Sequence, residues 1–217
     1  YEFFLRKELL NEFDNSTKML ITETVNIQQR IEQHIFLATS LRDIGFIKVS
    51  PRESHFDYSD IIINSKKLYF VFNDGRTWFS RHQEDIHLRS KQVGFETHVI
   101  LAHPNSIFLS SLSIKVDQAA EELTRKINET IKLISRMPWV NHDIKIYGHF
   151  LPTSYSLVMS EENAIFIPYP MARKADRLPC FTFSSKADEG FHGLLWRDVQ
   201  ELINHPHTEN LFPRKLL

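Results

Sequence analysis

The side chains best suited to bind a ligand fall in three short segments, each placed directly after a predicted strand. They are Pro51-Arg52-Glu53-Ser54, Asn73-Asp74-Gly75-Arg76 and His103-Pro104-Asn105-Ser106. Arginine offers a fixed fork of donors, and serine and asparagine add short hydrogen bonds, so such a set suits an anion such as a phosphate. The competing interpretation is that the two arginines form surface ion pairs with Glu53 and Asp74, and that Asn73-Asp74-Gly75 is only a turn.

These segments can meet only if the strands before them share one edge of a sheet. Short apolar runs predict strands at 46–49, 68–72 and 95–102, and helices are predicted at 58–64 and 78–93 between them. This alternation is typical of a parallel sheet with right-handed crossovers, whose strand ends form a binding edge. We therefore expect one site that contains Arg52, Asn73, Asp74, Arg76, His103, Asn105 and Ser106.

The rest of the chain predicts a mixed sheet flanked by helices. Apolar residues every three or four positions predict a long helix over 116–134, which Pro138 ends. Short strands joined by brief turns follow, and a final helix is predicted. The strands lie at 144–150, 154–159 and 164–169, with an edge strand at 181–183 and the helix at 190–203. The predicted class is α/β, with a parallel βαβαβ start and an antiparallel meander in the last third.

The first 43 residues predict one or two amphipathic helices. Leu5, Leu9 and Phe13 recur at a spacing of four, and Ile27, Ile31 and Ile35 repeat it after a polar stretch. This part is either a helix that packs on the sheet or a connector that pairs with its copy in a homodimer or relays a signal from an upstream segment. We expect a connector at 1–43, an α/β domain at 44–203 and a loose tail at 204–217.

Composition excludes several classes of partner. The chain has 26 Lys+Arg and 27 Asp+Glu, so no overall field draws it to nucleic acid or to an anionic membrane, and nucleic-acid binding is only weakly supported. The single Cys180 can form no internal disulfide, which favours a cytoplasmic location. No apolar run is long enough to cross a bilayer. A membrane contact is therefore expected only through a segment upstream of Tyr1, in which case the chain is the soluble part of an anchored protein.

Histidine is abundant but its spacing does not match a metal site. The chain holds 11 histidines, and neither a His-Glu-x-x-His motif nor paired cysteines occur. We expect no metal and no cofactor.

The order of the elements resembles one half of the phospholipase D-like fold, in particular the degenerate copies found as accessory domains of bacterial regulators. The segments that carry the resemblance are 47–54, 70–76, 100–106, 154–161, 166–170 and 194–196. Enzymes of that superfamily carry His-x-Lys-x4-Asp and attack phosphodiesters with the histidine. The matching positions here hold Ser154, Ser156 and Glu161. The resemblance therefore implies a chain without catalytic residues, in which Ser154 and Ser156 join the ligand site.

These observations predict a catalytically silent sensor domain. It would bind a phosphate- or nucleotide-containing ligand, or an anionic partner, and signal through its N-terminal helices. The alternative is a phosphodiesterase or nuclease that works through a non-standard site such as His103 with Arg52 and Arg76.

Overall fold

The structure, a computed structural model, describes residues 2–169, 178–187 and 190–212. Its contacts divide the chain into two compact units, Tyr1–Asp43 and Ile44–Leu217, which we describe separately.

The first unit is a single helix, α1 (Glu2–Asp43), of 42 residues. The polar stretch at 14–17 does not interrupt it. Asp, Asn, Ser and Thr each weaken a helix by less than about 1 kcal/mol, whereas a proline costs about 3 kcal/mol and none occurs before Pro51. The chain leaves the helix at Gly45, where the backbone adopts a φ of +76° that favours glycine.

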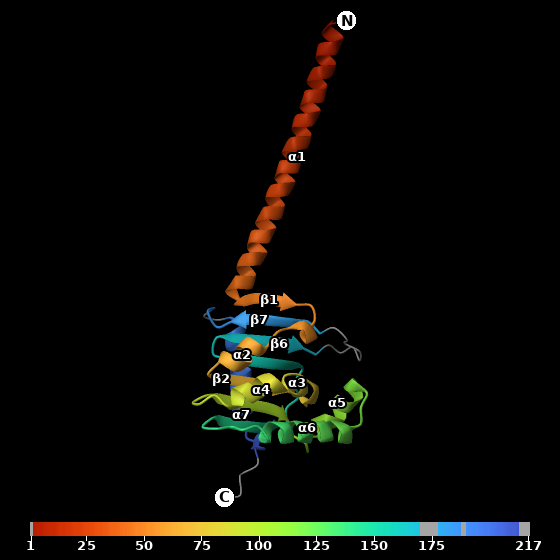
Figure 1. Cartoon of the computed structure of the whole chain (residues 1–217). Coiled ribbons are helices and arrows are strands. Elements are labelled where there is room, and N and C mark those ends of the chain that lie inside the picture. The colour runs from red at the N-terminus through yellow and green to blue at the C-terminus, as the bar shows by residue number, and fades with distance from the viewer. Residues whose placement is uncertain (1, 170–177, 188–189, 213–217) are drawn as a thin grey trace, which may run out of the picture. The chain divides into compact units, whose positions relative to one another are not determined.

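The second unit is built on one mixed sheet of eight strands in the order β1-β7-β6-β5-β2-β3-β4-β8 (Figure 1). The strands are β1 (Phe46–Ser50), β2 (Lys67–Phe72), β3 (Glu96–Ala102), β4 (Asp143–His149), β5 (Tyr155–Ser160), β6 (Asn163–Pro168), β7 (Cys180–Ser184) and β8 (Glu209–Asn210). The β2–β3 and β3–β4 pairs are parallel, and the other pairs are antiparallel. The predicted α/β class with a mixed sheet is therefore confirmed.

The predicted parallel neighbours are partly wrong. β1 is an edge strand that pairs antiparallel with β7, so β7, β6 and β5 separate it from β2. β4, which we expected in the meander, is instead the third parallel strand, and the meander consists of β5, β6 and β7. A periodic pattern identifies a strand but contains no information about which strand it will pair with.

Six helices and one short 3-10 turn complete the described part of this unit. They are η1 (Glu53–His55), α2 (Ser59–Asn64), α3 (Arg76–Arg81), α4 (Gln83–Ser90), α5 (Phe108–Val116), α6 (Ala120–Ser135) and α7 (Phe191–Asn204). The helix predicted over 78–93 is split in two at His82, where the backbone leaves the helical region. The sequence did not predict α5.

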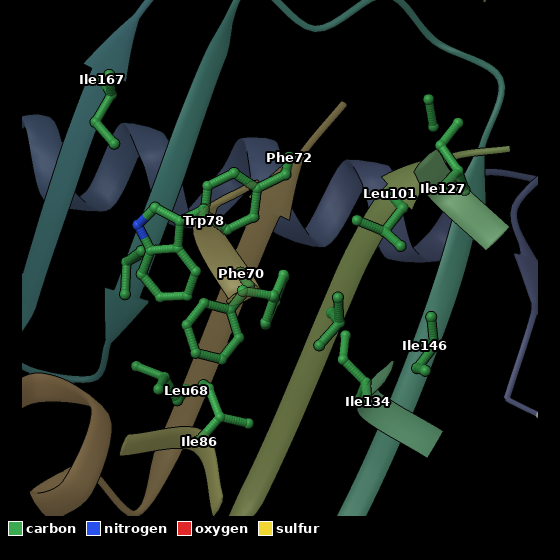
Figure 2. Close-up of a cluster of buried hydrophobic side chains, with 14 of the residues drawn as sticks. Leu68, Phe70, Phe72, Trp78, Ile86, Leu101, Ile127, Ile134, Ile146 and Ile167 are labelled. Carbon is green, nitrogen blue, oxygen red and sulfur yellow. The ribbon is translucent and has the colours of Figure 1, made fainter. Parts of the chain in front are cut away.

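The core has one layer on each face of the sheet. Side chains of a strand alternate between faces, so Leu68, Phe70 and Phe72 pack under α2 to α6, while Tyr69 and Val71 face α7. Figure 2 shows the first layer, in which the strand side chains meet those of the covering helices. α6 contributes Ile127 and Ile134 to this layer, together with Leu101 of β3 and Ile146 of β4.

The C-terminal segment is less loose than its composition predicts. β8 lies within it and pairs with β4, and the backbone N–H of Leu211 donates to the carbonyl of Ile146 at 2.7 Å. Residues 213–217 of the predicted tail lie outside the described residues. None of the described helices has both the length and the apolar character that a membrane span requires.

Candidate functional site

The ends of β2, β3 and β4 lie together at one edge of the sheet. The backbone N–H of Ala102 donates to the carbonyl of Asn73 at 3.1 Å, and that of His103 donates to His149 at 2.8 Å. The segments that begin at Asn73 and His103 therefore lie side by side, as predicted. The Arg52 segment follows β1, which three strands, β7, β6 and β5, separate from β2, so Arg52 does not join them through the sheet.

Asn73 and Asp74 hold the turn after β2. The Asn73 side chain is buried and accepts a hydrogen bond from the Thr153 hydroxyl at 2.6 Å. The Asp74 carboxylate accepts from the backbone N–H of Arg76 at 2.9 Å, and Thr130 donates to the Asp74 carbonyl at 2.7 Å. Gly75 has a φ of +66°, and a Cβ there would crowd the Phe79 ring. These partners assign a structural role to both residues.

His103, Asn105 and Ser106 hold the turn after β3 in a similar way. The buried His103 ring stacks on Phe150 with centroids 4.4 Å apart, and its Nδ1 accepts from the backbone N–H of Asn105. Its Nε2 lies 3.4 Å from a Glu209 carboxylate oxygen. The Ser106 hydroxyl accepts from the backbone N–H of Phe108, the first residue of α5.

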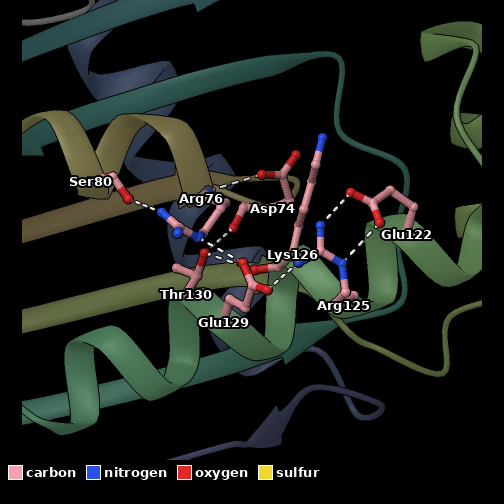
Figure 3. Close-up of polar contacts among 8 residues, drawn as sticks. All are labelled: Asp74, Arg76, Ser80, Glu122, Arg125, Lys126, Glu129 and Thr130. Atoms are coloured by element: carbon pink, nitrogen blue, oxygen red, sulfur yellow. Dashed lines mark hydrogen bonds and ion pairs between the residues drawn. The ribbon is translucent and has the colours of Figure 1, made fainter.

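Arg76 turns away from this edge towards α6. Its Nε donates to the Glu129 carboxylate at 2.8 Å, and Nη1 donates to the Ser80 hydroxyl. Glu129 also pairs with Arg125, so the contacts form a chain along α6 (Figure 3). The Arg76 guanidinium holds the pKa of the Glu129 carboxyl below its usual value. The ion pair that Arg76 forms is thus with Glu129, and not with Asp74 as the competing interpretation proposed.

Glu53 likewise pairs with a residue other than the expected Arg52. A carboxylate oxygen of Glu53 lies 3.1 Å from the Arg81 guanidinium of α3. Arg52 itself forms the N-terminal boundary of η1. Arg76 and Glu53 therefore each form an ion pair, as the competing interpretation expected. Their partners, Glu129 and Arg81, are distant in the sequence.

Ser154 and Ser156, the two serines that the resemblance aligns with catalytic positions, lie just before β5 and near its start. The buried Ser156 hydroxyl bonds to the Tyr169 hydroxyl, and the Ser154 carbonyl accepts from the backbone N–H of Tyr169 at 2.7 Å. Burial raises the pKa of Tyr169, so its phenol stays protonated at neutral pH. Among the described residues, the Ser156 hydroxyl meets a protonated phenol, and no hydrogen bond joins the Ser154 hydroxyl to a base of the kind that activates a nucleophile.

A cavity of about 220 Å³ opens where η1, α3 and the β5 and β6 ends approach one another. Its lining includes Glu53, Asp74, Trp78, Arg81, Ser156 and Tyr169. Among the described lining residues, two carboxylates face one guanidinium, which is already paired with Glu53. The charge balance of these described residues does not favour an anion.

A second hollow, of about 460 Å³, lies between α3 and α4 on one side and α6 on the other. We call it the basic groove and define it by Arg76, His87, Glu129, Lys132 and Arg136, with an apolar floor that includes Leu133 and Met137. Of the described residues, three cationic side chains line it against one carboxylate. Of the residues predicted for the anion site, Arg76 is the one that reaches this groove.

His87, Lys132 and Arg136 were not predicted as site residues. Lys132 and Arg136 follow the polar pattern of α6, which is typical of a helix face turned to solvent. The spacing of Glu129, Lys132 and Arg136 by three and four places them on one side of the helix. Only the packing of α3 and α4 beside α6 turns that side into a groove wall.

Comparisons with known proteins identify no family for this chain. No family model matches it, and no curated protein is similar to it. Among solved structures it is similar to TrmBL2, an archaeal chromatin protein that shows a novel mode of DNA binding. The TM-score is 0.41 at 11% identity, and the match covers 88% of this chain and 66% of that one. A similarity this distant carries no argument about the function of this chain.

Proposed function

We propose that this chain is a catalytically silent, phospholipase D-like regulatory domain that binds a small phosphate-containing ligand in the basic groove. The observation that supports this most directly is the gathering of Arg76, Lys132 and Arg136 around one hollow with a single opposing carboxylate. Ligand occupancy would be relayed through α1, which ends at Asp43, just before β1 begins at Phe46.

The groove offers both fixed and free cationic groups. Arg76 is anchored by Glu129 and Ser80, so its position is set before a ligand arrives. Lys132 and Arg136 make no hydrogen bond or ion pair with the described residues and are exposed. Charge-assisted bonds from such groups to phosphate oxygens are stronger than neutral ones. The preformed arginine orients the anion, and the two exposed cations close on it.

The size and floor of the groove suit a nucleotide better than a bare phosphate. Ligand cavities commonly enclose about 300–1,000 Å³ and combine an apolar lining with a few polar groups. The groove encloses about 460 Å³, and Leu133 and Met137 lie beside its cations. A ring system would contact the apolar side chains while the phosphate meets Lys132 and Arg136.

Charge reversal in the groove is expected to abolish this binding. In a thermal-shift and calorimetric screen of cyclic and linear nucleotides and inorganic phosphate, a ligand at 100 times its Kd should stabilise the fold by about 2.7 kcal/mol. Arg136→Glu should weaken binding by about tenfold or more, because it removes a charge-assisted contact and adds repulsion.

The matched control is Lys66→Glu, which makes the same charge change at an exposed lysine that does not line the groove. Equal losses of ligand affinity in the two variants would show a non-specific charge effect and contradict binding in the groove.

Incubation with a generic phosphodiester and with single-stranded DNA tests whether the chain lacks phosphodiesterase activity. Turnover that His103→Ala abolishes would establish the phosphodiesterase alternative instead.

A further inference from the structure

α1 exposes a series of large apolar side chains that its own unit does not cover. Ile27, Ile31, Ile35 and Leu37, on or beside one face, are 53%, 52%, 60% and 55% exposed, and Phe36 on the opposite face is 74% exposed. A helix with an uncovered apolar stripe is stabilised in water by packing that stripe against another element.

The spacing of the stripe identifies the kind of partner. A seam at intervals of three, four, three, four and three is formed by Thr24, Ile27, Ile31, His34, Ala38 and Leu41. In the sequence the alternation extends back through Leu20, Thr17 and Phe13. A period of 3.5 keeps a seam facing a second helix that supercoils with the first one. The partner is therefore a long helix with the same repeat.

We infer that α1 pairs with α1 of a second copy of this chain as a parallel, in-register coiled coil through this seam. The 42 residues of α1 span about 63 Å at 1.5 Å per residue. β-branched residues, Thr17, Thr24 and Ile31, occupy alternate seam positions, and Leu20 and Leu41 fall in the other set. β-branched residues in the first set with leucines in the second fit two parallel strands, and Ile27 is the β-branched exception in the second set.

The residues that flank the seam are compatible with self-pairing. In a parallel register, the residue just before Thr24, Ile31 or Ala38 meets the residue five positions later in the partner helix. The described pairs are Glu23 with Gln28, Arg30 with Ile35, and Leu37 with Arg42. No like charges face each other, and Ile35 and Leu37 gain partial cover. The second copy accounts for exposed apolar residues beside the seam as well as within it.

One substitution on each side of α1 tests the pairing in the full chain. The wild type should sediment at twice 25.6 kDa at micromolar concentration. Ile31→Lys should raise the dimer dissociation constant by about a hundredfold or more, because it places a charge in the seam. The matched control is Phe36→Lys, which alters a more exposed apolar side chain on the opposite face and should leave the dimer intact. A monomeric wild type, or equal loss in both variants, would overturn the inference.

Cross-linking tests the orientation separately. His34→Cys in a Cys180→Ser background should give a disulfide-linked dimer on mild oxidation, since equivalent seam positions meet only in a parallel register. Gln33→Cys in the same background points away from the seam and should remain unlinked. A dimer whose seam cysteines do not cross-link would rule out the parallel arrangement. Circular dichroism of every variant confirms that the chain remains folded.

Discussion

Arg89→Met is expected to lower the free energy of unfolding by about 4 kcal/mol or more. Arg89 is completely buried, and its guanidinium makes five hydrogen bonds that tie α4 to the entries of β2 and β3. The acceptors are the carbonyls of Ile62, Ser65, Lys66 and Glu96 and the hydroxyl of Thr97. Each buried acceptor left without a donor costs about 1–3 kcal/mol.

Arg89 remains charged in the folded protein at neutral pH. Burial lowers its pKa to about 9, but four carbonyl oxygens surround the group and favour its protonated form. Arg89→Lys keeps the charge but replaces a planar fork with a single point, so most of the bonds are lost. We expect its stability to fall between that of the wild type and that of Arg89→Met.

Urea denaturation monitored by circular dichroism measures both changes. Arg81→Met is the control, because Arg81 is an exposed arginine with one ion pair to Glu53. Removing such a surface pair should cost about 1 kcal/mol or less. If Arg89→Met cost no more than Arg81→Met, the buried guanidinium would not be a structural anchor.

Acidification is expected to destabilise the fold through histidines that are buried in their neutral form. His149 of β4 is fully buried, and burial lowers its pKa from 6.5 to about 4. Burial also lowers the pKa values of His82, His98, His142 and His192. In each case the unfolded chain binds a proton at a higher pH than the folded one does.

Because the histidine pKa values are lower in the folded chain than in the unfolded one, acid lowers the free energy of unfolding. Above pH 6.5 His149 is neutral in both states and contributes no pH dependence. As the pH falls from 6.5 to about 4, the unfolded state gains protons first, and stability decreases by about 1.4 kcal/mol per pH unit. The loss from His149 alone reaches about 3 kcal/mol, and the other four histidines add to it.

Unfolding free energies measured in urea between about pH 7.5 and pH 4.5 test this prediction. His149→Leu replaces the imidazole with an apolar side chain of similar size and so removes the titrating group. Its stability should fall less steeply with acid than that of the wild type. Parallel curves for the two proteins would show that His149 does not carry the effect.

Local patterns in the sequence determined most of the elements and their order. The apolar run before His103 became β3, the amphipathic series after Val116 became α6, and Gly45 marks the exit from α1. These features depend on periodicity, on β-branched residues and on the backbone freedom of glycine, which act over a few positions. The same local rules led to the α/β class and to a mixed sheet.

Tertiary structure alone decided which distant residues meet. Arg76 pairs with Glu129, which lies 53 positions later in the chain, and β1 joins β7 at the far edge of the sheet. Arg89 lies in the polar segment predicted as a helix over 78–93, and the packing of α4 in the folded domain buries it completely. The groove beside Lys132 exists only because two helices pack next to α6. Pairing and burial depend on the simultaneous packing of the whole domain, and no short stretch of sequence contains that information.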